Sequence, residues 1–328
     1  MITNSRMVYL IIYVSNLERS RDFYERKLGL RVIEEDAESV KYDGGQTIIM
    51  LNRAGDYGIE LPEPPDESAQ IVFLVGDIDR TQRGLEERGV AFSGGMKYEV
   101  GAVADFYDPD GHHLVLYEAS TKALGWSSGP KVEALWKATV GSESDVPIFG
   151  SRSANGAGHP PDVTVELDGR PLVYLFLFVT DSDVTEQFYA GTLGLTPLEG
   201  GPCSRSSGGD EDGVVKYDTG GIMLTTHHLD TTRGPIVYDG HVCPPRDFDP
   251  TRARGVAPVF EVAGINGVVN ELSRKGVGFQ NGVRQLSVGR IARFEDPSGH
   301  LLFLYEPSDE ALGWPSGEKI RQILAAPL

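Results

Sequence analysis

Three side chains that can take part in acid–base chemistry lie on stretches that the sequence predicts to be apolar strands: Glu261, His113 and Tyr174. A carboxylate among apolar side chains is costly unless it is paired, and burial raises its pKa. Glu261 is therefore a candidate general acid or base, and Arg290 or Arg293 on a neighbouring strand is its expected partner. A solvated Glu261 at the rim of a sheet is the competing interpretation.

His113 is the corresponding candidate in the first half of the chain. If Tyr9 and Gln70 lie nearby, the three side chains form a hydrogen-bonding cluster that can orient a carbonyl or a phenol. A structural role beside a turn is the alternative for this histidine. His112 and His300 follow their turns at matching positions, so we interpret them as residues that stabilise the turns.

The sequence lacks the short motifs of several common chemistries. It has no glycine-rich phosphate loop after a strand, no GxSxG elbow and no CxxC pair, and its two cysteines are Cys203 and Cys243. Its densest histidine stretch is His227-His228. Adjacent residues of a strand point to opposite faces, so this pair can share one site only in a loop. An unorthodox metal site that combines His227 or His228 with Glu261 is kept as an alternative.

The composition bounds the class of protein. A chain of 328 residues is long enough for about two domains, and a hydrophobic content of 40% suffices for real cores. The formal net charge of −18 argues against nucleic acid and anionic membranes as partners, because both repel an acidic surface. No apolar run reaches the roughly 18 residues of a membrane span, and the N-terminus lacks the pattern of a signal peptide. We therefore expect a cytoplasmic protein.

An internal duplication organises the chain. The stretch Asp108–Ser120, a proline-containing turn that leads into an apolar strand, recurs as Asp296–Ser308, and Ala123-Leu124-Gly125-Trp126 recurs as residues 311–314. Each half holds two βαβββ patterns. The sequence thus predicts an α+β protein with tandem domains at 1–140 and 171–328. Residues 141–170 form a Gly/Ser/Pro-rich linker, and the second domain carries two loop insertions, around 200–213 and within 226–250.

Several local motifs carry a resemblance to a known family. They are Val14–Tyr24 with Leu28-Gly29-Leu30, their counterparts Val179-Thr180-Asp181, Phe188-Tyr189 and Leu193-Gly194-Leu195, and the Asp-Pro-Asp-Gly and Asp-Pro-Ser-Gly turns. Over about 7–120 and 172–308 the chain resembles the vicinal oxygen chelate superfamily. That superfamily includes glyoxalase I, bleomycin-resistance proteins, fosfomycin-resistance enzymes and type I extradiol dioxygenases. The resemblance implies paired βαβββ modules with cup-shaped mixed sheets, and the tandem layout is most similar to that of the dioxygenases.

The resemblance also implies where a metal would be held. Metal-using members place His, Gln or Glu on the cup faces of the first and last strands of their modules. The matching positions are Tyr9, Ile49 or Met50, Gln70 and Val115 in the first half, and Tyr174, Leu224 or Thr225, Ala257 and Phe303 in the second. Gln70 is the one conventional ligand in this set, and one neutral ligand with a phenol does not hold a divalent ion. We therefore expect no metal and no cofactor.

Strand alternation predicts what lines the cups instead. If Tyr9 faces a cup, Ile11 and Tyr13 do too, whereas Val8 and Leu10 pack under the helix. We expect each half to build its own cup. The candidate substrate-binding residues are aromatic apart from one amide: Tyr9, Tyr13, Gln70, Tyr117, Phe176, Phe178, Phe303 and Tyr305. A cup filled by its own core is the alternative.

Three functions fit this pattern. The protein sequesters a small, largely apolar aromatic or polyketide-like molecule, as bleomycin-resistance relatives do with their drug. Alternatively, it is a metal-independent lyase, isomerase or cyclase of secondary metabolism, with Glu261, His113 or Tyr174 as acid–base groups. The third function is a metal-dependent extradiol dioxygenase or glyoxalase-type enzyme with unusual ligands. The sequence favours the first two, leans mildly towards an enzyme, predicts a small-molecule ligand as the partner, and leaves a homodimer open.

One substitution tests whether the second half binds the ligand. If Tyr174 is a buried aromatic anchor, Tyr174→Ala should weaken ligand binding by about 1–3 kcal/mol. Isothermal titration of the folded variant measures this loss. An unchanged affinity would place the site in the first half.

Overall fold

The computed structural model describes residues 1–3, 5–61, 68–141, 145–150, 167–199, 214–228, 236–238, 241–243 and 255–326. The predicted linker at 141–170, the two predicted insertions and Cys203 lie largely or wholly outside these residues. The division of the sequence at 140 and 171 therefore stays a prediction.

Four βαβββ modules make up the fold, as the sequence predicted. Module 1 contains β1 (Met7–Val14), α1 (Leu17–Arg21) with the π-helix η1 (Asp22–Lys27), β2 (Val32–Glu35), β3 (Ser39–Asp43) and β4 (Ile48–Arg53), and the 3-10 helix η2 (Ala54–Tyr57) follows. Module 2 contains β5 (Ala69–Leu74), α2 (Ile78–Glu87), β6 (Phe92–Tyr98), β7 (Gly101–Tyr107) and β8 (His113–Ala119).

The second half repeats this order. Module 3 contains β9 (Leu172–Val179), α5 (Ser182–Glu186) with the π-helix η3 (Gln187–Leu193), β10 (Thr196–Glu199), β11 (Val214–Asp218) and β12 (Met223–His228). A short hairpin, β13 (Ile236–Tyr238) and β14 (His241–Cys243), precedes module 4. Module 4 contains β15 (Val256–Glu261), α6 (Ile265–Arg274), β16 (Phe279–Leu286), β17 (Gly289–Glu295) and β18 (Leu301–Pro307).

Polar caps and glycines set the ends of the module helices. The Asn16 side chain accepts a hydrogen bond from the Arg19 backbone N–H at 3.0 Å, and Asp181 does the same for Val184. Each cap satisfies a backbone donor that the first helical turn leaves free. Gly29 follows the first helix with a φ of 76°, a left-handed conformation that glycine adopts without steric cost.

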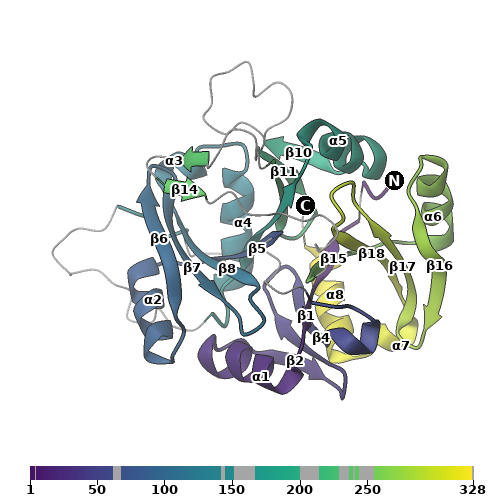
Figure 1. Ribbon diagram of the computed structural model, residues 1–328, viewed down its shortest axis with the longest axis horizontal. Coiled ribbons are helices and arrows are strands. Elements are labelled where there is room, and N and C mark those ends of the chain that lie inside the picture. Colours follow the sequence, from purple (N-terminus) through teal and green to yellow (C-terminus); the bar gives the residue numbers. More distant parts are fainter. Residues whose placement is uncertain are drawn as a thin grey trace.

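The strands form two open, eight-stranded mixed sheets, which confirms the predicted α+β class. Sheet A has the order β16-β17-β18-β15-β1-β4-β3-β2, and sheet B has the order β10-β11-β12-β9-β5-β8-β7-β6. Figure 1 shows that the purple strand β1 and the yellow-green strand β15 lie side by side, although they are far apart in the sequence.

The composition of the two cups corrects the sequence-based expectation. Strand β1 pairs antiparallel with β15, so module 1 shares sheet A with module 4. Strand β5 pairs antiparallel with β9, so module 2 shares sheet B with module 3. Neither half of the chain builds a cup by itself. The physical reason is that the first strand of every module offers an edge for pairing with another module. Sequence patterns do not reveal which module supplies the partner strand.

Alternation places the strand residues on the predicted faces, with one exception. Tyr9, Ile11 and Tyr13 line the cup of sheet A, whereas Leu10 and Ile12 pack in the core beneath the helices. Val8 also belongs to the cup cluster, contrary to the prediction. The pairing of β1 with β15 is irregular between Met7 and Tyr9, so alternation fails at this end of the strand.

The Trp-containing extension of each half packs against a cup. Helices α3 (Thr121–Leu124) and α4 (Gly129–Val140) bury Val132, Leu135 and Trp136 against sheet B. Helices α7 (Asp309–Leu312) and α8 (Pro315–Ala325) bury Ile320 and Ile323 against sheet A. The cups therefore receive apolar side chains from helices as well as from strands.

A buried aspartate joins the two modules of each half. Asp108 accepts a hydrogen bond from the Tyr24 hydroxyl of module 1 at 3.1 Å and lies 2.9 Å from Nδ1 of His112. Asp296 makes the same contacts with Tyr189, at 2.9 Å, and with His300. The prediction that these histidines stabilise their turns is confirmed. Although burial alone would raise the pKa of Asp108, the charge and hydrogen bonds of His112 lower it below its ordinary value.

Asp108→Asn should lower the free energy of unfolding by about 1–3 kcal/mol at pH 7, because a buried charge-assisted network loses its acceptor. A lowered carboxyl pKa contributes stability above the unfolded-state pKa of about 3.9, and that contribution is lost as pH falls through the folded-state pKa. The variant should therefore lose less stability than the wild type below about pH 4. Urea unfolding across pH measures both effects. Asp79→Asn, which breaks an exposed ion pair with Lys97, is the control and should change stability by less than about 0.5 kcal/mol.

Candidate functional site

One row of residues across the cup of sheet B combines hydrogen-bonding groups with an aromatic floor. Strand registers place Thr225 beside Phe176, Phe176 beside Gln70, and Gln70 beside His113. Phe176 is the one partly exposed residue in the otherwise buried strand β9. A flat ring can stack on such a side chain while polar groups on either side bind its substituents.

A chain of three polar side chains ends this row. Gln70 Nε2 lies 3.1 Å from His113 Nδ1, and His113 Nε2 lies 2.8 Å from Asp105 Oδ1. The ring of Tyr107 stacks on the imidazole, with centroids 4.9 Å apart. If the Gln70 amide donates to Nδ1, the imidazole proton sits on Nε2 and is donated to Asp105. Both ring nitrogens then have partners, and the Gln70 carbonyl oxygen is the acceptor that remains for a ligand.

This arrangement modifies the cluster expected around His113. Gln70 contacts the histidine as predicted, but Tyr9 lies on sheet A and is not part of the cluster. Asp105 was missed by the sequence analysis. Alternation on the neighbouring strand β7 could have identified it. Val103, Asp105 and Tyr107 lie on the cup face of that strand, whereas Ala104 and Phe106 lie on the core face. His113 therefore positions Gln70, and a role as a freely accessible base is not what this geometry favours.

Two buried polar atoms on β12 face the same cup and have no hydrogen-bond partner among the residues that the structure describes. They are Thr225 Oγ1 and Nε2 of His227, and the imidazole of His227 packs on Phe178 with ring centroids 5.6 Å apart. Burial, assisted by His228, lowers the pKa of His227 to about 4, so this side chain is neutral at pH 7. An unsatisfied buried polar atom is costly, and a ligand hydroxyl or carbonyl can satisfy it.

The helical extension occupies the other end of the sheet B cup. The Lys216 ammonium lies over the rings of Trp126 and Tyr174, at 4.6 and 5.5 Å from their centroids. Tyr117 contacts the Tyr174 ring at 6.1 Å and donates its hydroxyl to the Val100 carbonyl at 3.0 Å. Tyr174 and Tyr117 thus belong to the packed end of the cup, whereas Phe176 and Phe178 lie towards the polar end. Their roles in binding or catalysis stay predictions.

The equivalent row in sheet A is apolar. Met50, Ile11 and Ala257 are neighbours in register, and Leu301 and Phe303 extend the same cluster. At the end covered by the extension, the rings of Tyr9 and Tyr305 lie 6.0 Å apart, and Tyr305 donates to the Val288 carbonyl at 2.7 Å.

Tyr9 is itself closed off by that extension. Burial raises its pKa to about 12, and its hydroxyl bonds Ser316 at the start of α8. Tyr13 lies at the opposite end of β1, beside Tyr57.

Glu261 does not pair with either predicted arginine. Arg290 forms an ion pair with Glu306, and Arg293 acts electrostatically on Tyr13. Glu261 ends β15 beside Tyr305 and is half-buried, and burial together with the charge of Glu306 raises its pKa. The predicted direction of the pKa shift is therefore present, but the predicted partner is wrong.

The donor sets at the predicted metal positions do not fit a divalent ion. Packing resolves the open alternatives, because Ile49 and Leu224 lie in the core, which leaves Met50 and Thr225 on the cup faces. With the modules paired as observed, sheet A offers Tyr9, Met50, Ala257 and Phe303, and sheet B offers Tyr174, Thr225, Gln70 and Val115. Neither set contains the two or more imidazoles or carboxylates that such an ion requires.

The alternative metal site with two histidines is also not assembled. His227 and Glu261 lie on different sheets, and His228 points to the other face of β12, with Nε2 3.1 Å from the Thr180 carbonyl oxygen. Among the described residues, no group of three or more His, Cys, Asp and Glu side chains is placed to hold a metal ion.

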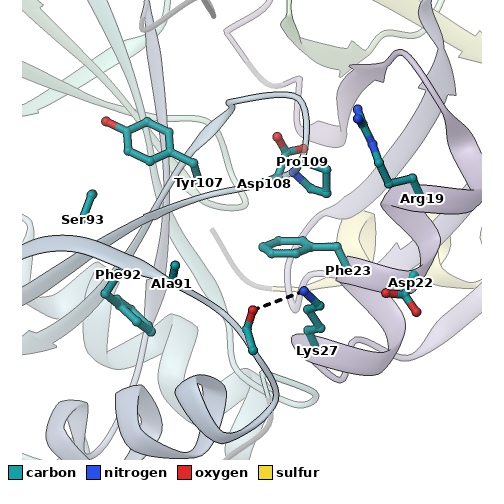
Figure 2. A pocket seen from close by; sticks show the side chains of 11 residues that line it. Arg19, Asp22, Phe23, Lys27, Ala91, Phe92, Ser93, Tyr107, Asp108 and Pro109 are labelled. Atoms are coloured by element: carbon teal, nitrogen blue, oxygen red, sulfur yellow. Dashed lines mark hydrogen bonds between the residues drawn. The ribbon is translucent and has the colours of Figure 1, made fainter.

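A surface cleft of about 580 Å³ lies outside both cups, between η1 and the β6–β7 side of module 2 (Figure 2). Phe23 points into it from η1, Phe92 lines it on the module 2 side, and Lys27 donates to the Gly89 carbonyl at 3.2 Å. Arg19 is already bound to Asp110 at 2.6 Å. The cationic groups of this cleft, Arg19 and Lys27, are thus engaged in contacts between modules 1 and 2. We therefore do not assign the cleft as the functional site.

Comparison with known proteins places this geometry in context. Residues 6–116 and 172–304 match the family model of the Glyoxalase/Bleomycin resistance protein/Dioxygenase superfamily. An uncharacterised protein of Bacillus subtilis strain 168, YwkD, is 30% identical over 128 residues, which span 34% of this chain and 94% of that protein.

Two solved structures extend over nearly the whole chain. Glyoxalase I from Zea mays has a TM-score of 0.55 and 13% identity, over 98% of this chain and 96% of the maize protein. A putative dioxygenase from Bacillus subtilis has a TM-score of 0.53 and 16% identity, over 92% of this chain and 86% of that protein. At these identities the likeness shows the fold alone. In the part of the chain that the structure describes, no helix is both long and apolar enough to span a membrane.

The buried His227 should make stability depend on pH. Its pKa of about 4 lies below the unfolded value of about 6.5, so the unfolded state binds more protons between these values and stability falls on acidification. His227→Phe keeps the ring contact with Phe178 and removes this titration. The wild type should lose on the order of 2 kcal/mol more than the variant between pH 7 and pH 5, measured by urea unfolding. Equal losses would show that His227 is not buried as a neutral imidazole.

Proposed function

Because the chain belongs to the Glyoxalase/Bleomycin resistance protein/Dioxygenase superfamily, we propose that it binds a small, flat, largely apolar aromatic or polyketide-like molecule in the cup of sheet B. The observation that carries this proposal is the row Thr225–Phe176–Gln70–His113. It sets a partly exposed phenyl ring between hydrogen-bonding groups, which is the make-up of a pocket for a planar ligand.

The polar groups define what the ligand offers. The Gln70 carbonyl oxygen accepts a hydrogen bond, so a phenolic hydroxyl or an N–H group of the ligand is its complement. Thr225 and the neutral His227 on the other side can each complete a hydrogen bond with a second substituent. The ring itself stacks on Phe176, with Phe178 as a second aromatic wall.

The same reasoning favours sheet B over sheet A for this ligand. The matched row of sheet A, built on Ile11, Met50 and Ala257, has no hydrogen-bonding side chain and no aromatic floor. An apolar row of this kind is typical of a filled core. The ligand is a small molecule rather than nucleic acid or an anionic membrane, since the net charge of −18 repels both. A homodimer stays open.

A metal-independent lyase, isomerase or cyclase is the second candidate for the same cup. The pairing of His113 with Asp105 favours it, because a carboxylate fixes the tautomer and the orientation of an imidazole. Rotation of the Gln70 amide away from Nδ1 would present this ring nitrogen to a substrate as an acid–base group. Turnover distinguishes the two functions, since a sequestering protein binds stoichiometrically and forms no product. The metal-dependent reactions are disfavoured by the donor sets of both cups.

Phe176→Ala should weaken binding of flat aromatic probes by about tenfold to a hundredfold, because the ligand loses its stacking surface. Emodin, juglone and 2-naphthol are suitable probes, titrated by calorimetry and by quenching of intrinsic fluorescence. Ile11→Ala is the matched control, because Ile11 holds the same position in sheet A and should leave the affinity unchanged. Tyr174→Ala is less discriminating, since it also disturbs the packing of Trp126 and Lys216.

The outcomes separate the two cups. Weaker binding in Phe176→Ala with wild-type affinity in Ile11→Ala supports sheet B. Loss of binding in the Ile11 variant alone would transfer the site to sheet A. Absence of saturable binding by all three probes would contradict a pocket for flat aromatic molecules.

A further inference from the structure

Arg293 is a cation on the cup face of sheet A that forms no ion pair with the described residues. It alternates on β17 with the core residues Ala292 and Phe294 and pairs in register with Phe303 of the cup. Its Nε atom is buried and has no hydrogen-bond partner in the part of the chain that the structure describes. Among the described residues, no carboxylate forms an ion pair with it. Glu295, on the same face, accepts a hydrogen bond from Gln280 at 3.0 Å.

Tyr13 links Arg293 to two more polar side chains at this end of the cup. Tyr13 lies within its electrostatic reach, and Asn52 is the neighbour of Tyr13 in register on β4. The ring of Tyr57 contacts Tyr13 edge to face, with centroids 5.8 Å apart. Asn52 is 2% exposed, and its Oδ1 atom has no hydrogen-bond partner in the described part of the chain. The two phenol hydroxyls and the guanidinium can donate hydrogen bonds, whereas Oδ1 of Asn52 is an acceptor.

An unpaired guanidinium in such a place has an energetic cost. The side chain as a whole is partly exposed, but its buried Nε–H group has no hydrogen-bond partner among the described residues, and an unsatisfied buried donor is unfavourable. The chain carries 48 acidic and 30 basic residues, so carboxylates for pairing are abundant, yet none of those described is used here. A bound carboxylate supplies both an acceptor for this N–H group and a charge opposite to that of the guanidinium.

We propose that the Tyr13–Arg293 end of the sheet A cup binds an aromatic carboxylate, with Arg293 holding the carboxylate and the rings of Tyr13 and Tyr57 flanking the aromatic part. A single guanidinium balances one negative charge, and its planar fork matches the two oxygens of a carboxylate. A phosphate dianion would leave excess negative charge at this site. The second site lies on a different sheet from the row that carries the proposed function, so it does not rest on that function.

The duplicated position in the other cup supports this selectivity. Asp105 of β7 pairs in register with Val115, as Arg293 of β17 pairs with Phe303. One duplicated site thus carries a carboxylate that holds His113, and the other carries a guanidinium that has no ion-pair partner among the described residues. The two cups are therefore expected to bind ligands of different charge.

Paired probes that differ in one charge test the proposal. We would titrate the full-length protein with 2-naphthoate and with its neutral amide, 2-naphthamide, by calorimetry at low ionic strength. The wild type should bind 2-naphthoate at least tenfold more tightly than 2-naphthamide, and added salt should reduce this preference. Arg293→Gln should abolish the preference and leave binding of 2-naphthamide unchanged. Arg293→Lys should retain part of it, because the charge remains without the planar fork.

Thermal unfolding without ligand separates a binding role from a structural one. If Arg293 lacks a partner in the free protein, Arg293→Gln should keep or raise the melting temperature, whereas loss of a structural ion pair would lower it. Emodin binding should be the same in this variant and in the wild type, because that probe is assigned to sheet B. Equal affinity of the wild type and Arg293→Gln for 2-naphthoate would overturn the proposal. Failure of 2-naphthoate to bind the wild type, or a lowered melting temperature in the glutamine variant, would also overturn it.

Discussion

The antiparallel pairings of β1 with β15 and of β5 with β9 are the contacts on which the rest of the structure depends. Each pairing joins a module of the first half to a module of the second half, and each creates one eight-stranded cup. The buried aspartates Asp108 and Asp296 act in the other direction, because they join the two modules of one half. Strand pairing across the halves and hydrogen bonding within them thus close the four modules into one unit.

Because of this pairing, the helical extension of each half, α3–α4 or α7–α8, covers a cup that contains a module of the other half. Helix α4 contacts module 3 through an ion pair between Lys131 and Asp218 at 2.9 Å, and α8 contacts module 1 through Lys319 and Asp43 at 2.7 Å. Each half therefore covers a cup that the other half helps to build. The covered ends of the cups are packed and largely apolar, whereas Thr225, His227, Asn52 and Arg293, which each have a buried polar atom without a partner among the described residues, lie away from the extensions. The two cups share one scaffold, but equivalent positions carry different residues. Asp105 and His227 in the cup of sheet B correspond to Arg293 and Asn52 in the cup of sheet A.

Local structure could be predicted from the sequence, whereas long-range pairing could not. The strand Met7–Val14, the caps at Asn16 and Asp181 and the faces of Tyr9 and Tyr13 depend on neighbouring residues and alternation, which one sequence contains. The irregular pairing that turns Val8 into the cup depends on the partner strand.

The same limit explains which site residues were found and which were missed. Gln70 was correctly placed beside His113 because their strands are the first and last strands of one module. Tyr9 was wrongly placed with them, because the sequence offers no measure of which module supplies the neighbouring edge. The predicted partner of Glu261 was wrong for a related reason. Arg290 and Arg293 lie on opposite faces of one strand, and only the packed sheet shows that Arg290 forms an ion pair with Glu306.

The central claim is that both cups work without a resident metal ion, because Tyr9, Met50, Ala257 and Phe303 in one and Tyr174, Thr225, Gln70 and Val115 in the other do not form a ligand set. Metal content tests this claim most directly. The protein would be purified without chelator or added metal, soaked separately in Fe²⁺, Mn²⁺ and Zn²⁺, desalted, and measured by mass spectrometry of the elements. The account predicts retention well below one equivalent per chain for all three ions. Retention near one equivalent that disappears in Gln70→Ala would contradict it and would restore a metal-dependent reaction.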